Sequence, residues 1–364
     1  MQTQSTPMSV TLKATTPRAA LPPLSIPGPR KITRGVLLSE RYRLCKPIAL
    51  GKQAYLWEGV DTADQKAVRV RVFRIPGNRL NQLARMTRIL EGLSSAAPSN
   101  ESYMATFLTA GDIDKRNFLV FAAYGDSLRQ IIERADLMPL PINQVKAIAH
   151  QVSSGINFLH TQKLIHTNIK PENIVLVDSS TSEITTFANR TFQTRLVLKT
   201  PIVRIVDYEH SEFTGVRRQY QVGTCEYRAP EITMGLPWSK PVDIFAMGCV
   251  IYELCTGTRL LHRTSDIVER LATIEKAVAP FPRQYVTAIL PCDRYFFDGN
   301  PQPRVLFPAS YHRINSADLR VKNTTVKAKS LQQFLIRCLA PAPADRIGAS
   351  DAMAHTFIMS ATHI

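Results

Sequence analysis

Residues 166–173 read His-Thr-Asn-Ile-Lys-Pro-Glu-Asn, and this short run decides most of what the sequence implies. It joins polar and charged side chains in one loop-like segment that contains a proline. At its centre stands Asn168, whose neutral amide has no titratable oxygen and cannot accept a proton near pH 7. A proton transfer that depended on this position would therefore lack its base.

The sequence on both sides of this run has the pattern of helices. Apolar residues recur at three- and four-residue spacing over 142–159, which predicts an amphipathic helix that leads into the run. Residues 242–255 are apolar almost all round, which predicts a second helix in the core. The chain from about 124 to 357 is therefore expected to form a large α-helical lobe.

The preceding part of the chain has a different texture. Residues 67–73 alternate apolar and charged side chains at period two, which predicts a strand, and a small β-rich lobe fits residues 41 to about 123. Residues 1–34 mix Pro, Thr, Ser and Arg without a period, which indicates a disordered basic tail. The predicted fold class is α+β, with a β-rich N-lobe followed by a helical C-lobe.

Composition sets broad limits on partners and compartment. The 364 residues are 45% hydrophobic and carry a formal net charge of +16, which favours contact with acidic partners or nucleic acid. The basic residues are scattered rather than clustered, so direct nucleic-acid binding stays an alternative. None of the six cysteines forms a C-x-x-C pair, and we expect buried free thiols. With no apolar signal or membrane-spanning stretch, we expect a nuclear or cytoplasmic protein without a membrane partner.

Several motifs follow one another in the order that they have in protein kinases. They are the 166–173 run, Asp207-Tyr208-Glu209, Ala229-Pro230-Glu231, Asp243 at the start of the buried helix, and Arg346 near the end. The chain resembles the protein kinases from about residue 41 to 357. The resemblance implies the bilobal protein-kinase fold, with Glu231 paired to Arg346 and with Asp243 holding the backbone of the loop.

A narrower resemblance is to the LAMMER kinases of the CMGC group. It rests on residues 157–160, 227–231 and 238–243, and on residues 269–276, which look like a worn copy of the signature of that family. The resemblance implies dual-specificity nuclear kinases that act on Ser/Arg-rich splicing factors, with splicing proteins or another kinase as partners. This chain has 29 acidic against 45 basic residues, so a basic substrate would be repelled on average.

The same resemblance places changes at the groups that transfer phosphate. Asn168 stands where a kinase has its catalytic Asp, which accepts the proton of the substrate hydroxyl. Arg71 stands at the position of the kinase lysine that holds the α- and β-phosphates, and Arg69 stands beneath the adenine; in a register shifted by two, Arg69 is the Lys equivalent. In kinases that lysine pairs with a Glu on the following helix, and Met86 stands at the position of this Glu. Glu91, about five residues later, is interpreted as a solvated surface charge.

Other groups of the expected site survive. Lys170 and Asn173 match the catalytic-loop Lys and the metal-binding Asn, and Asp207 matches the Asp that holds magnesium. An Asp207 carboxylate that only accepts local backbone hydrogen bonds is an equal alternative. The candidate nucleotide contacts are Arg71, Phe121 and Gly51. Gly51 is the one glycine left in the phosphate-covering loop, which is about two residues shorter than in kinases. The candidate cofactors are ATP and magnesium.

These observations predict a LAMMER-like pseudokinase, a protein-binding or regulatory scaffold with absent or very low phosphoryl transfer. Two alternatives stay open. The first is an active Ser/Thr kinase in which Arg71 contacts phosphates and the Asn168 carbonyl orients the hydroxyl. The second is a basic nucleic-acid or protein scaffold that uses residues 1–34.

Overall fold

The structure is a computed structural model that describes residues 32–51, 54–74, 80–97, 99–114, 116–188, 191–207, 211–216, 218–288 and 329–359. Most of the predicted tail, residues 52–53 of the phosphate-covering loop, Tyr208, Glu209 and Cys292 therefore lie outside the described residues. The last residues of the predicted tail are described. Among them the Ile32 side chain is only 1% exposed, so packed structure begins inside the segment that was expected to be a tail.

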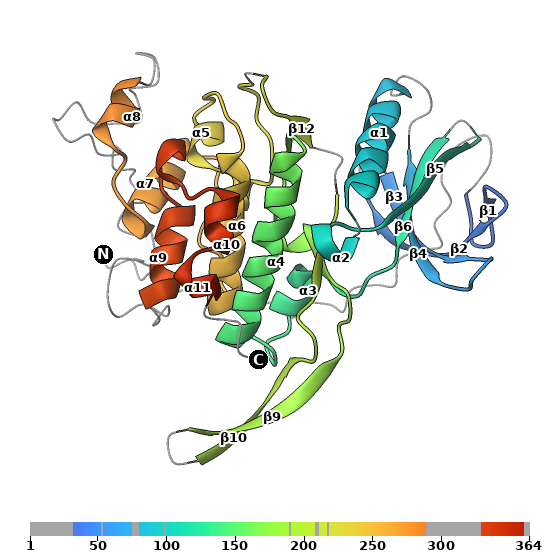
Figure 1. The fold of residues 1–364 in the computed structure, drawn as a ribbon, viewed down its shortest axis with the longest axis horizontal. Helices are drawn as coiled ribbons and strands as arrows, with labels where there is room; N and C mark the ends of the chain where they lie inside the picture. Colours follow the sequence, from blue (N-terminus) through green and yellow to red (C-terminus); the bar gives the residue numbers. More distant parts are fainter. Residues whose placement is uncertain are drawn as a thin grey trace, which may run out of the picture. The chain divides into compact units, whose positions relative to one another are not determined.

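The chain divides into two compact units, residues 1–76 with 111–118, and residues 77–110 with 119–364. The chain forms a six-stranded sheet with the strand order β1-β2-β3-β4-β6-β5, of which β1 to β4 and the adjoining ends of β5 and β6, within residues 111–118, lie in the first unit (Figure 1). The strands are β1 (Leu37–Leu38), β2 (Tyr42–Leu50), β3 (Ala54–Asp61), β4 (Ala67–Phe73), β5 (Phe107–Ile113) and β6 (Arg116–Ala122).

Strand β4 confirms the strand predicted over residues 67–73. Its alternation has the expected cause: Val68, Val70 and Val72 are buried on one face, and the two arginines between them are only half-buried on the other. Strand β4 pairs antiparallel with β3, and the register sets Arg69 opposite Glu58. Residues of opposite charge thus face each other on the same side of the sheet.

The second unit is mainly helical, and helices α4 and α6 pack against each other at its centre (Figure 1). Both confirm the helices predicted from periodicity, α4 with an amphipathic pattern and α6 buried almost all round. The unit contains α1 (Leu80–Ala96), α2 (Ser99–Ser102), α3 (Leu128–Ile132), α4 (Ile142–Thr161), α5 (Pro230–Thr233), α6 (Pro241–Thr256), α7 (Ile267–Ala277), α8 (Arg283–Ala288), α9 (Lys329–Cys338), α10 (Ala349–Met353) and α11 (Thr356–Met359).

Short antiparallel pairs in this unit position the 166–173 loop between them. Strand β7 (Leu164–Ile165) leads into the loop and pairs with β12 (Glu212–Phe213), while β8 (Ile174–Leu176) leads out of it and pairs with β11 (Val203–Ile205). A longer hairpin, β9 (Thr181–Ala188) with β10 (Thr191–Leu198), extends from the unit (Figure 1). Among the described residues, no helix has both the length and the apolar character that crossing a membrane requires.

Candidate functional site

The loop of residues 166–173 is held from below by the first turn of α6. The buried Asp243 carboxylate accepts hydrogen bonds from the backbone N–H groups of His166 and Thr167, at 2.9 and 2.8 Å. Its Oδ2 also lies 2.9 Å from His160 Nε2, near the end of α4. A buried carboxylate is stable only when such donors satisfy it. Asp243 therefore fixes the loop backbone, as the sequence led us to expect.

His166 fixes the loop from inside. Its side chain is fully buried, its Nδ1 accepts from the Asn168 N–H at 3.2 Å, and its Nε2 donates to the Val206 carbonyl at 3.0 Å. One ring nitrogen thus acts as acceptor and the other as donor. The ring connects the loop to Val206, the residue before Asp207, so it brings two parts of the expected site together.

Asn168 lies 8% exposed at the centre of the loop. Its side-chain Oδ1 accepts the hydroxyl hydrogen of Thr224 over 2.9 Å. The backbone of Gly223 lies close to the Thr167 carbonyl oxygen, since a Cβ on Gly223 would lie only 2.7 Å from that oxygen. Gly223 also has a φ of 72°, which favours glycine. Thr167 itself has a φ of 68°, which is rare for a β-branched residue. The loop and residues 223–224 are therefore fitted to each other.

The loop also brings together the residues expected to hold magnesium. Asn173 is buried and donates its side-chain N–H to the Asn168 carbonyl at 2.9 Å, which leaves the Asn173 Oδ1 as an oxygen ligand of the kind that magnesium prefers. Asp207, half-buried, follows Val206 with a left-handed φ of 74°. Lys170 stands half-buried between Asn168 and Asn173 in the chain. No cluster of three or more His, Cys, Asp or Glu side chains suited to a metal ion occurs among the described residues.

In the first unit, the sheet face that carries Arg71 is crossed by a row of charges. Glu58 on β3 forms ion pairs with Arg69 on β4, at 3.0 Å, and with Lys46 on β2, at 3.1 Å. Burial alone would raise the pKa of the Glu58 carboxyl, but the hydrogen bond from Lys46 and the charge of Arg69 outweigh it and lower the pKa. The position expected beneath an adenine thus carries an arginine held by a neighbouring carboxylate.

The other expected nucleotide contacts are less informative. Gly51 is exposed directly after β2, and a Cβ there would lie 2.7 Å from the Ala54 carbonyl oxygen, so this close backbone approach by itself accounts for the glycine. Phe121 on β6 is half-buried and stacks edge-on with Phe107 at 5.7 Å between ring centroids. Their roles toward a nucleotide stay predictions.

Helix α1 contains the position of the expected ion-pair partner. Met86 is 5% exposed, as befits an apolar side chain, while Glu91 is exposed, in agreement with its interpretation as a surface charge. The helix instead pairs through Arg85, which donates to Glu212 on β12 at 2.9 Å and to the Ser211 carbonyl at 3.0 Å.

A buried charge cluster beside the loop was not predicted from the sequence. Arg129 on α3 donates to Glu253 on α6 at 2.9 Å and to Glu172 of the loop at 3.2 Å. The Tyr227 hydroxyl donates to Glu253 at 2.6 Å and accepts from Arg129 at 2.5 Å. Burial and the hydrogen bond to Glu253 raise the pKa of Tyr227. The one signal in the sequence is Glu253 itself, a carboxylate near the end of a largely apolar helix, which requires hydrogen-bond donors or a cation when it is buried.

A second buried pair supports the segment after the loop. Arg346 donates two hydrogen bonds to Glu231 at 2.6 and 2.7 Å, and both side chains are almost fully buried. This fork geometry is the strong form of an arginine–carboxylate pair. The pair inferred from the family resemblance is confirmed.

Comparison with known proteins agrees with this geometry. The family model described as protein kinase domain matches residues 44–358. Serine/threonine-protein kinase AFC2 of Arabidopsis thaliana is 30% identical over 69% of this chain and 60% of the relative, and dual specificity protein kinase CLK2 of Homo sapiens is 29% identical over 89% of this chain and 65% of the relative. The chain thus spans less than two thirds of the length of either relative.

A solved structure extends the agreement to the fold. The crystal structure of a kinase domain superposes with a TM-score of 0.79 at 22% identity, over 90% of this chain and 97% of the other. The fold class is therefore confirmed as α+β, with a β-rich N-lobe and a helical C-lobe. The sequence match, the matched fold and the Asp243, His166 and Glu231 contacts agree, and this chain belongs to the protein kinase domain family, with homologues among the LAMMER-like dual-specificity kinases.

Proposed function

We propose that this kinase-domain protein acts as a protein-binding scaffold with absent or very low phosphoryl transfer. The observation that carries the proposal is the hydrogen bond from Thr224 to the amide oxygen of Asn168. It keeps the side chain in place at the centre of the loop, yet an amide oxygen cannot take up the proton of a substrate hydroxyl near neutral pH. The side chain of residue 168 thus keeps its position in the loop but has no basic group.

The groups expected to contact a nucleotide support the same proposal. Arg69 is committed to Glu58, and Arg71 supplies a planar guanidinium where kinases use a compact ammonium. Met86 offers no carboxylate to either arginine. Because phosphoryl transfer depends on positioned charges, each of these changes lowers the rate.

Contacts that only hold the fold are intact by contrast. Asp243 is satisfied by three donors, and Glu231 pairs with Arg346 in two hydrogen bonds. A protein that keeps the buried scaffold and changes the reacting groups is suited to presenting surfaces to a partner. Partner proteins of LAMMER-like kinases, in splicing or in kinase signalling, belong to this proposal.

The experiment is thermal unfolding of the intact chain with and without millimolar ATP and magnesium. A ligand that binds only the folded state raises stability by RT ln(1 + [L]/Kd), so even weak binding is detected. We expect no shift. A magnesium-dependent shift that disappears in Asp207→Asn would instead support the alternative of a weak Ser/Thr kinase that uses Asn173 and Asp207.

A further inference from the structure

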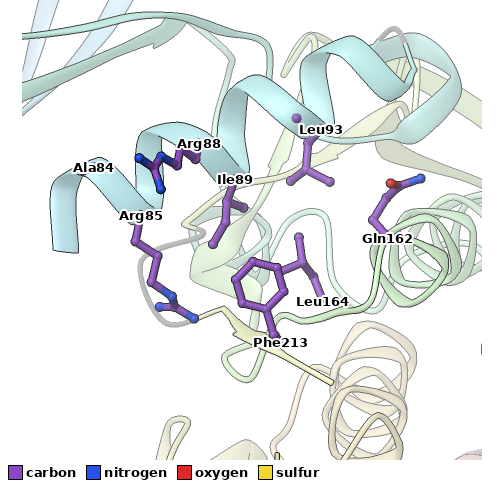
Figure 2. Close-up of a pocket in the computed structure, with 9 residues that line it drawn as sticks. Ala84, Arg85, Arg88, Ile89, Leu93, Gln162, Leu164 and Phe213 are labelled. Carbon is purple, nitrogen blue, oxygen red and sulfur yellow. The ribbon is translucent and has the colours of Figure 1, made fainter. Parts of the chain in front are cut away.

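A cavity of about 560 Å³ lies under helix α1, within the second unit. Figure 2 shows Ile89 and Leu93 pointing down from the helix toward Leu164 on β7 and Phe213 on β12. These four side chains give the cavity an apolar floor. The remaining lining residues are Ala84, Arg85, Arg88, Gly92 and Gln162.

The floor retains exposed apolar surface. Phe213 is 44% exposed although it is a large aromatic residue, and the Arg85 guanidinium lies 5.5 Å from the centre of its ring. An aromatic side chain in a concave site with aliphatic neighbours is a strong anchor point for a partner. The cavity is therefore suited to take up apolar side chains.

The rim of the cavity is positively charged. Arg88 is exposed, and the structure shows no carboxylate partner for it among the residues that it describes. Arg85 is also at the rim, where Glu212 already satisfies it at 2.9 Å. None of the nine lining residues carries a negative charge. An occupant with carboxylates beside its apolar side chains would thus complement both the floor and Arg88.

We propose that this cavity docks an acidic, apolar peptide segment of another protein. Segments of the chain outside the described structure are poor occupants: residues 1–31 contain no Asp or Glu, and residues 289–328 carry six basic against three acidic residues. A second copy of the chain, with its net charge of +16, is repelled. An amphipathic helix that lays an apolar face against the cavity, with acidic side chains beside that face, is the kind of ligand that such grooves bind.

The proposal rests on the scaffold function proposed above, for which it names a docking site. Phe213 follows Glu212 on β12, and Glu212 also pairs with Arg218 at 2.9 Å and accepts from the Tyr220 hydroxyl at 2.8 Å. A peptide seated on Phe213 therefore contacts the strand that anchors residues 218–220. Docking at this place would stabilise α1 and that segment together.

The test uses fluorescence anisotropy with the intact chain and synthetic peptides of about 15 residues that carry Leu and Phe at helical spacing with Glu between them. Peptides with Lys in place of Glu, peptides with Ser in place of Leu and Phe, and a single-stranded RNA of similar length serve as comparison probes. Two variants challenge the site: Arg88→Glu reverses the rim charge, and Gly92→Leu places a side chain into the cavity, where a Cβ meets nothing within 4 Å.

Each variant has a matched control. Gly92→Ala fills far less of the cavity than Gly92→Leu, and Lys199→Glu makes the same charge reversal at an exposed residue that does not line the cavity. We expect saturable binding of the acidic apolar peptides only, weakened about tenfold or more by Arg88→Glu and by Gly92→Leu and unchanged in both controls.

Three results would overturn the proposal: no binding of the acidic apolar peptides, equal loss in the Lys199→Glu control, or preferential RNA binding that Gly92→Leu leaves intact. The last result would identify a plain cationic surface. None of these results bears on nucleotide binding or transfer, so the docking site can fail while the proposed lack of transfer stands.

Discussion

Thr224 donates its hydroxyl hydrogen to the side-chain oxygen of Asn168 over 2.9 Å, and this contact joins residues 223–228 to the loop of residues 166–173. On the function proposed above, the site persists as structure without its base. The amide oxygen satisfies the same donor that a carboxylate would satisfy, so the local packing does not require an Asp. The constraint on residue 168 from folding is therefore separate from any constraint from catalysis.

Restoring the carboxylate alone is expected not to restore transfer. In Asn168→Asp the new side chain still accepts from Thr224, but on the family resemblance Arg71 and Met86 stand where a kinase has its phosphate-binding lysine and the carboxylate partner of that lysine. We expect no labelled product above background when the variant is incubated with labelled ATP, magnesium and general protein substrates. Transfer by Asn168→Asp at a rate typical of protein kinases would mean that residue 168 is the only defect.

The buried cluster around Glu253 is expected to dominate the stability of the helical unit. Replacing Arg129 by Met leaves the Glu253 carboxylate, 2% exposed, without its closest cation, which costs about 3–5 kcal/mol of unfolding free energy. Urea denaturation measures the loss. The control is Arg134→Met, which removes an exposed pair with Asp136 and is expected to cause no measurable change.

The double variant Arg129→Met with Glu253→Leu tests the cause. Replacing both charges by apolar side chains removes the buried carboxylate as well, so much of the lost stability should return. If Arg129→Met costs no more than the Arg134→Met control, the cluster contributes no net stability and our interpretation of it fails.

Arg346→Lys is expected to destabilise the protein although it keeps the charge. The guanidinium makes two hydrogen bonds to Glu231 and donates further to the Ala340 and Pro341 carbonyls, and a lysine cannot make all of these contacts from one nitrogen. Each buried acceptor left without a donor costs about 1–3 kcal/mol, so thermal unfolding should occur at a clearly lower temperature. The exposed pair of Arg134 with Asp136 provides the comparison, because Arg134→Lys should have no measurable effect; equal behaviour of both variants would contradict the role assigned to the buried pair.

Glu58 is expected to contribute stability that depends on pH. Its pKa is lowered below the ordinary value of 4.5, because Lys46 and Arg69 outweigh the effect of burial. A lowered carboxyl pKa stabilises the folded state at pH values above the ordinary pKa, and this contribution is lost as pH falls through the folded-state pKa. The difference in unfolding free energy between the native chain and Glu58→Gln should thus be constant near neutral pH and shrink below about pH 4.5. A difference that grew on acidification would contradict the assigned ion pairs.

The repeating elements of this fold could be predicted from the sequence because their cause is local. The apolar period over 142–159, the apolar run over 242–255 and the alternation over 67–73 each reflect one buried face, and α4, α6 and β4 form there. The family order of motifs added the Glu231–Arg346 pair and the role of Asp243. Both are visible in sequence because the motifs that contain them are short and fixed.

The remaining contacts of the site could not be predicted, because they join residues far apart in the chain. Arg129 and Glu253 are separated by 124 positions, and Arg85 and Glu212 by 127. No periodicity connects such residues, and scattered arginines in a basic chain give no sign of which ones are buried. The pairing of Arg69 with Glu58 depended likewise on the register between two strands, which is fixed only once the sheet forms.

The most direct test of the account is phosphoryl transfer by the intact native chain, measured with labelled ATP, magnesium or manganese, and broad protein substrates beside Asp207→Asn. Asp207 is the carboxylate expected to hold the metal ion, so the variant reports the background from any contaminating kinase. We expect the native chain and Asp207→Asn to give the same trace signal. Transfer by the native chain that Asp207→Asn abolishes would contradict it and establish an active kinase.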